Sequence, residues 1–179
     1  MLCRIRALAL LMTVLAAPVF AQDIPPAPKP GPEHQRLHEL VGTWNCKMKM
    51  AGAPEALDAM ATYKSELGGL WIASEFKCDS PVFKFTGKGL DGYDTNKKKY
   101  VGTWADSLST GLMVFEGTYD EKTKTTTMEG QGYNEQGKLA KYRNVTKETD
   151  ADHFTFEMFM IGDDGTATSA FTIEYTRKK

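Results

Sequence analysis

The sequence is poor in the residue types on which most catalytic and metal sites depend. It has only three histidines and three cysteines among 179 residues. It contains no Gly-x-Ser-x-Gly nucleophile elbow, and no His-Glu-x-x-His zinc motif surrounds its one close histidine pair. These absences leave no recognisable catalytic motif, and we expect neither a cofactor nor a metal. An enzyme stays possible but is not favoured.

An excess of basic charge is also missing. The chain has 22 Lys and Arg residues against 23 Asp and Glu residues. Nucleic-acid binding requires a concentrated basic surface, so the balance argues against a nucleic-acid partner. Lys97-Lys98-Lys99 is the one basic cluster before the C-terminal Arg177-Lys178-Lys179, and we interpret it as a solvated hairpin end.

Long apolar runs are absent beyond the first 21 residues. Met1–Ala21 has a basic start at Arg4 and Arg6, followed by an uncharged apolar run over Ala7–Ala17. It ends in Val19-Phe20-Ala21, which is typical of a signal-peptide cleavage site. This pattern predicts a signal peptide cleaved near Ala21, because the run is too short to span a bilayer comfortably. We therefore expect a periplasmic or secreted protein without a stable membrane anchor.

Proline is concentrated in one place and scarce elsewhere. Gln22–Pro32 holds five of the eight prolines, whereas only Pro54 and Pro81 follow. A segment so rich in proline is extended and cannot pack a core, so residues 22–32 are predicted to form a linker. The remaining residues, 33–179, have the length of one domain.

The domain starts with the one convincing helical pattern. In Glu33–Val41 the apolar residues Leu37, Leu40 and Val41 recur at helical spacing, and Gly42 is expected to end the helix. His34 and His38 would share a helix face and could bind a metal together. A closed site needs further ligands, so exposed helix positions are the favoured interpretation.

Beyond Gly42 the chain reads as about ten short strands separated by turn signals. Trp44–Met50 shows the pattern most clearly, because apolar residues alternate with Asn and Lys. Short connections favour antiparallel neighbours, and a long meander leaves exposed edges unless it closes. We therefore predict an all-β fold, a single antiparallel up-and-down β-barrel closed at one end by the helix. The expected strands are Trp44–Met50, Asp58–Leu67, Leu70–Cys78, Phe83–Tyr93, Lys99–Ala105, Leu112–Thr118, Thr123–Gly132, Lys138–Glu148, His153–Ile161 and Ala167–Arg177.

The segment Asp106–Gly111 gathers a carboxylate and three hydroxyls between two strands. Asp106, Ser107, Ser109 and Thr110 could form the polar mouth of a binding cavity. The same residue types also close and cap turns, which explains each of them without any ligand. Both interpretations stay open at this stage.

A barrel of this size can enclose one small ligand or be filled by its own side chains. The alternation directs Met48, Met50, Phe76 and Trp104 inward, among other apolar residues. The phase of Lys138–Glu148 is ambiguous. Tyr142 and Asn144 face inward in one phase, whereas in the other Arg143 is a buried cation that needs an anionic partner. The candidate ligand-binding residues are Trp104, Asp106, Ser107, Ser109, Tyr93, Arg143, Tyr142, Met48 and Phe76.

Two cysteines, Cys46 and Cys78, remain after removal of the predicted signal peptide. An isolated pair in an oxidising compartment favours a disulfide. A meander, however, puts a whole strand between the two residues, and that separation exceeds the usual reach of a bridge. A disulfide and two free thiols are both retained as alternatives.

Several short motifs resemble known families. Gly42-Thr43-Trp44, after a helix and at the start of a strand, resembles the Gly-x-Trp signature of lipocalin and fatty-acid-binding (calycin) barrels. From Glu33 to Lys179 the chain is similar to a bacterial family catalogued as domain of unknown function 1579, which implies a lipocalin-like barrel and no assigned activity. The residues that carry this resemblance are Leu40–Trp44, Leu67–Trp71, Gly92–Asp94, Lys98–Trp104, Asp106–Gly111, Glu116–Asp120 and Asp152–Glu157.

Three hypotheses on function follow. The first is an exported protein that binds a small lipophilic or amphipathic ligand inside the barrel. The second is an envelope interaction or stress protein that acts through its outer surface, with the outward-facing Trp71 as a contact. The third is an enzyme that uses Asp94, His153 or the Asp106–Thr110 region. The first is favoured, and the sequence leaves the oligomeric state open.

Overall fold

The computed structural model describes residues 26–134 and 136–179. The predicted signal peptide, Met1–Ala21, and the first part of the predicted linker lie outside these residues. The described part of the linker precedes the first helix without regular secondary structure. The helix, α1, covers Pro32–His38.

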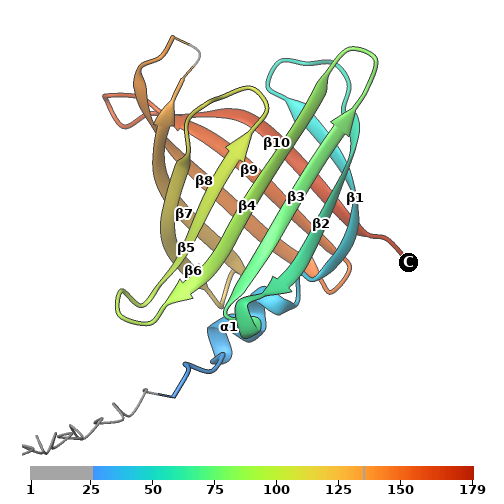
Figure 1. Ribbon diagram of the computed structural model, residues 1–179. Helices are drawn as coiled ribbons and strands as arrows, with labels where there is room; N and C mark the ends of the chain where they lie inside the picture. The colour runs from blue at the N-terminus through green and yellow to red at the C-terminus, as the bar shows by residue number, and fades with distance from the viewer. Residues whose placement is uncertain (1–25, 135) are drawn as a thin grey trace, which may run out of the picture.

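Ten strands follow α1 and form a closed barrel, as the sequence predicts (Figure 1). Each strand pairs antiparallel with its neighbours in the chain, and β1 pairs with β10 to close the ring. Closure satisfies the backbone groups that a ten-stranded meander would otherwise leave exposed at its edges. The strands are β1 Gly42–Met50, β2 Leu57–Glu66, β3 Trp71–Asp79, β4 Lys84–Asp94, β5 Lys99–Asp106, β6 Met113–Asp120, β7 Thr125–Tyr133, β8 Leu139–Asp150, β9 His153–Ile161 and β10 Ala167–Arg177.

The alternation of the sequence sets which side chains face the interior. In β1 the side chains of Trp44, Cys46 and Met48 are buried, whereas the residues between them are exposed. Because a strand has a side-chain period of two, one inward residue fixes the phase of the whole strand. The same rule places Trp71 of β3 on the outer face, opposite Gly92 of β4.

The two ends of the barrel differ. Helix α1 lies across the end that carries the β2–β3, β4–β5, β6–β7 and β8–β9 turns, which we call the helix end (Figure 1). The opposite end carries the β1–β2, β3–β4, β5–β6, β7–β8 and β9–β10 connections, and we call it the loop end. All residues of the Asp106–Gly111 segment therefore lie at the loop end, far along the barrel from α1.

The helix is shorter than its apolar pattern predicts. It ends at His38 with Glu39 as C-cap, and the amides of Leu40 and Val41 then bond to carbonyls three residues back. These tighter turns follow the helix and lead into β1, which begins at Gly42. Leu40 still packs against the core, but Val41 is exposed.

A packed aromatic core fills part of the helix end. Phe154 stacks on Tyr175 with ring centroids 4.1 Å apart, and Trp44 meets Phe154 edge-on at 4.7 Å. The guanidinium of Arg177 lies 4.1 Å from the centre of the Trp44 ring and donates to the carbonyls of Val41 and Glu39. Arg177 thus joins the end of β10 to the turn between α1 and β1.

The strand boundaries lie within one or two residues of expectation, and at two of them a leucine leaves its predicted strand. Leu67 is predicted to end a strand, but it lies in the one-turn 3₁₀ helix η1, Leu67–Gly69, and is exposed. The chain must reverse here, and Leu67 itself adopts positive φ while Gly68 and Gly69 complete the reversal. Leu112 also lies outside its strand, which begins at Met113.

Cys46 and Cys78 are both buried free thiols. They face the same side of the sheet with Ala59 of β2 between them, because Cys46 pairs with Ala59 and Ala59 pairs with Cys78. The intervening strand keeps the two sulfur atoms apart, which is the arrangement that a strict meander implies. Each thiol instead donates to a backbone carbonyl, Cys46 to Trp44 and Cys78 to Asp58.

Candidate functional site

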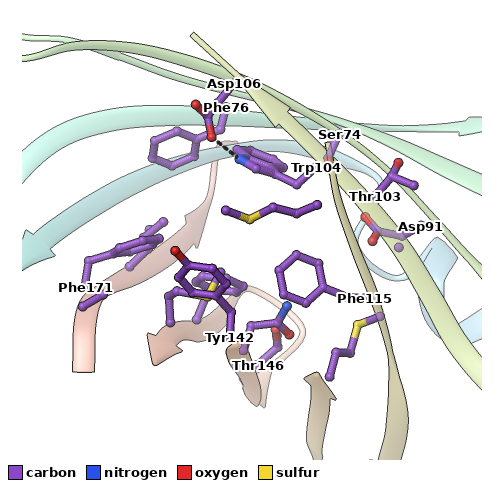
Figure 2. Close-up of a pocket in the computed structure, with 18 of the residues that line it drawn as sticks. Ser74, Phe76, Asp91, Thr103, Trp104, Asp106, Phe115, Tyr142, Thr146 and Phe171 are labelled. Atoms are coloured by element: carbon purple, nitrogen blue, oxygen red, sulfur yellow. Dashed lines mark hydrogen bonds between the residues drawn. The ribbon is translucent and has the colours of Figure 1, made fainter. Parts of the chain in front are cut away.

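The barrel encloses a cavity of about 1220 Å³. It extends from Leu37 and Leu40 of the helix end to the loops of the opposite end. Its wall is mainly apolar, with aromatic and methionine side chains from most strands (Figure 2). The interior is thus divided: the packed core around Trp44 and Phe154 fills one part of the helix end, and the rest is hollow.

Trp104 of β5 forms much of the wall near the loop end. Its indole lies flat against β4, where a side chain at Gly87 would overlap the ring. The indole N–H donates to Asp106 over 3.0 Å, and the other carboxylate oxygen of Asp106 accepts from the amide of Leu108. Figure 2 shows the Trp104–Asp106 pair at the edge of the cavity. The predicted residues Trp104 and Asp106 therefore both line the cavity, and Asp106 also closes the turn.

The serines of the same segment mainly serve the turn. Ser107 exchanges two hydrogen bonds with the backbone of Thr86 on β4, and Ser107 does not line the cavity. Ser109 accepts from the amide of Gly111 and does line the mouth, together with Thr110. The segment therefore closes the turn, and Asp106, Ser109 and Thr110 also line the cavity.

Strand β8 resolves the ambiguity in its phase. Tyr142 and Asn144 are buried and line the cavity, so Arg143 points outward. Arg143 forms an ion pair with Glu129 of β7, its register partner, at 2.7 Å. Arg143 as an interior ligand anchor is therefore wrong. The carboxylate that pairs with Arg143 is thus Glu129 on the outer face, and the cavity supplies no partner to this cation.

The remaining candidates divide between the cavity and its helix end. Met48 and Phe76 line the cavity as predicted. Tyr93 does not line it: the ring lies at the helix end, 6.0 Å from His34 of α1 and 5.2 Å from Tyr100 between ring centroids. Tyr93 thus connects α1 to the barrel.

A polar cluster lies where α1 meets the cavity. The guanidinium carbon of Arg36 lies 3.3 Å from the centre of the Tyr119 ring, and its Nη1 is 3.4 Å from Glu148. The Tyr119 hydroxyl donates to the same carboxylate over 3.2 Å. Arg36 and Glu148 both border the cavity. Among the described residues that line the cavity, the one cation, Arg36, is therefore already paired.

Asp91 of β4 is the cavity residue that the sequence interpretation missed. It lines the cavity together with Phe85, and within the described residues it makes no hydrogen bond or ion pair. Figure 2 shows it on the same wall as Ser74 and Trp104. Desolvation raises the pKa of its carboxyl to about 7, because no cation offsets the loss of water. A signal was present, since Asp91 shares the two-residue period of Phe85 and Tyr93 within a predicted strand.

The three histidines are all at the helix end. His34 is buried and accepts from the Gly31 amide, and His38 lies 2.9 Å from the carbonyl of Gly69. His153 pairs with Asp150 at 2.8 Å on the surface. None of them lines the cavity, so no imidazole reaches the Asp106–Thr110 segment. Within residues 26–134 and 136–179, no three His, Cys, Asp or Glu side chains are grouped to hold a metal ion.

The fold and the interior together define a closed ten-stranded antiparallel β-barrel with an internal cavity. Within its described residues, no helix has the length and apolar character to cross a membrane. The family model described as "Protein of unknown function (DUF1579)" matches residues 29–177. The chain belongs to this family, as the sequence resemblance implies.

Solved structures support the fold alone. The crystal structure of Rv2717c from M. tuberculosis is similar with a TM-score of 0.59 at 12% identity, over 83% of this chain and 99% of that one. A redesigned β-barrel has a TM-score of 0.42 at 12% identity, covering 79% and 94% of the two chains. No curated protein matches this sequence.

Proposed function

We propose that this protein is an exported carrier or sensor that binds one small lipophilic or amphipathic molecule inside the barrel. The observation that carries the proposal is the cavity of about 1220 Å³ with its mainly apolar wall. A hollow of this size, with few polar groups among aromatic side chains, is typical of small-molecule sites. Export is supported by the pattern of Met1–Ala21 in the sequence.

The aromatic side chains near the loop end offer a surface for such a molecule. Phe83 stacks on Phe85 at 5.8 Å, and Phe85 stacks on Trp104 at 6.5 Å between ring centroids. Across the cavity Phe156 stacks on Phe171 at 6.0 Å. Methionines also line the cavity, and flexible side chains of this type adapt to ligands of different shape.

The first experiment is mass spectrometry of the protein purified from its own host, under native and then denaturing conditions. A carried ligand adds mass under native conditions that is lost on denaturation, and the difference gives the ligand mass. In parallel, the purified protein is titrated with an environment-sensitive apolar dye. A bare polypeptide mass together with no dye uptake would overturn the proposal.

Two variants show whether binding takes place in the cavity. Met158→Trp adds a large ring to the cavity wall, so we expect dye affinity to fall about tenfold or more. Phe159→Trp is the matched control, because the next residue of β9 has the opposite orientation. Equal affinities of the two variants would place the dye on the outside of the barrel.

A further inference from the structure

The charged groups on the cavity wall are unevenly balanced. Among the described residues that line the cavity, three are acidic and one is basic: Asp91, Asp106 and Glu148 against Arg36. Arg36 is already held by Glu148 and Tyr119, and Asp106 accepts from Trp104 and Leu108. Of these three carboxylates, only that of Asp91 has neither an ion pair nor a hydrogen bond within the described residues.

Asp91 lies deep in the cavity. It is the eighth residue of β4, which begins at the loop end with Lys84. Seven residues span roughly 23 Å of strand, and the tilt usual in barrels reduces this to a depth of roughly 18 Å. Its carboxylate lies above the bare backbone of Gly102, its register partner on β5.

The surroundings of Asp91 supply no positive charge. Its register partners are Gly102 on β5 and Ile72 on β3. The ionisable groups near it are the Tyr63 and Tyr175 hydroxyls of β2 and β10. Burial raises the pKa of both tyrosines, so they stay neutral. An ionised carboxylate here is costly unless a ligand provides its partner.

We propose that Asp91 receives the protonated amine of an amphipathic ligand, whose apolar part extends along the aromatic wall toward the loop end. This inference rests on the proposed function and names the ligand class: lipophilic amines. An ammonium group supplies both the charge and the hydrogen-bond donors that the Asp91 carboxylate lacks. A fatty acid fits less well, because its carboxylate would meet three acidic groups and one cation that is already paired.

The test compares three probes with the same tail: decylamine, decanol and decanoate. Each compound is titrated into the wild-type protein with bound apolar dye at pH 7.5, where the amine is protonated, and displacement of the dye is measured. We expect decylamine to bind about 10- to 100-fold more tightly than decanol, and decanoate to bind most weakly. Asp91→Asn keeps the shape but removes the charge, and should lower the decylamine affinity by the same factor while decanol changes less than about twofold.

The matched control is Asp58→Asn on the outer face of β2. Asp58 is highly exposed and forms an ion pair with Lys47 at 2.7 Å, so it loses the same charge without touching the cavity. Its decylamine affinity should equal that of the wild type. Thermal unfolding of both variants shows that they are folded before binding is compared.

The outcomes separate this inference from the proposed function. If neither the dye nor any decyl compound binds the wild type, the proposed function fails, and this inference fails with it. If decanol binds as tightly as decylamine, or if Asp91→Asn keeps the decylamine affinity, Asp91 does not bind an amine. The proposed carrier function is then unaffected. A preference for decanoate would also overturn it and would point to Arg36 as the anchor.

Discussion

The carboxylate of Asp91 occupies the space that a side chain on Gly102 would need. A methyl group at Gly102 would overlap one carboxylate oxygen of Asp91, so the two positions depend on each other. The same pairing of a bulky group with a glycine recurs nearer the loop end, where the Trp104 indole lies across Gly87. The glycines of β4 and β5 thus allow the side chains of Trp104 and Asp91 to lie against the cavity wall.

Gly102→Ala should therefore displace Asp91 and destabilise the protein by about 1–3 kcal/mol, the usual cost of overpacking. Decylamine affinity should fall as well, because the carboxylate moves from its position. Urea denaturation measures the first effect and dye displacement the second. Gly111→Ala is the control, since a Cβ there makes only ordinary contacts. Unchanged stability of Gly102→Ala would show that the carboxylate is free to move away.

The stability of the protein should depend on the titration of Asp91. Its pKa is about 7 in the folded protein and near 4 in an unfolded chain, so the folded state holds the extra proton between these values. The contribution of Asp91 is therefore most favourable below pH 4, declines as pH rises, and reaches its full penalty above pH 7. The change amounts to up to about 4 kcal/mol.

Asp91→Asn isolates this contribution, because the other titrating groups are common to both proteins. The free energy of unfolding of the variant, relative to the wild type, should increase from pH 4 to pH 8. Tyr63 and Tyr175 stay neutral throughout this range, since burial raises the pKa of each. Parallel pH profiles for the two proteins would mean that water in the cavity solvates the carboxylate.

Trp104 should report ligand entry through its fluorescence. Of the three tryptophans, Trp104 lines the cavity, Trp44 is packed at the helix end and Trp71 is on the outer face. Decanol should change the emission of the wild type and of Trp71→Phe, but not that of Trp104→Phe. The assignment of the cavity as the binding site fails if Trp71→Phe alone loses the signal.

Arg177 should contribute to stability through the helix end. Arg177→Ala removes the stacking on Trp44 and the hydrogen bonds to the carbonyls of Val41 and Glu39. We expect a loss of about 2 kcal/mol, measured by urea denaturation. The exposed neighbour provides a control, and Lys178→Ala should change stability by less than about 0.5 kcal/mol.

Cys46 and Cys78 should resist alkylation in the folded protein. Both are buried, and burial raises the pKa of the Cys46 thiol to about 12, so little reactive thiolate is present. Iodoacetamide should label both residues only after unfolding, with or without a reductant. A Cys46–Cys78 peptide pair linked under non-reducing conditions would contradict this prediction.

The sequence was sufficient to predict the barrel but not the proposed ligand anchor, Asp91. Alternation in segments such as Trp44–Met50 identifies a strand and its inward face, and short connections leave a closed meander as the simplest topology. In β8 polar residues occur on both faces, so only the register shows that Tyr142 faces inward and Arg143 pairs with Glu129. Asp91 lies within the predicted strand Phe83–Tyr93, but it was overlooked because Gly87 and Gly89 interrupt the apolar alternation on its face of the strand.

Helix α1 and the core around Trp44 cover part of the helix end, so we expect a ligand to enter at the loop end. By that route, the part of the ligand that enters first would lie deepest in the cavity. A ligand held by Asp91 would enter amine first and leave tail first. Its tail would stay nearest the opening, where a receiving membrane or protein could take hold of it while the ion pair is still intact.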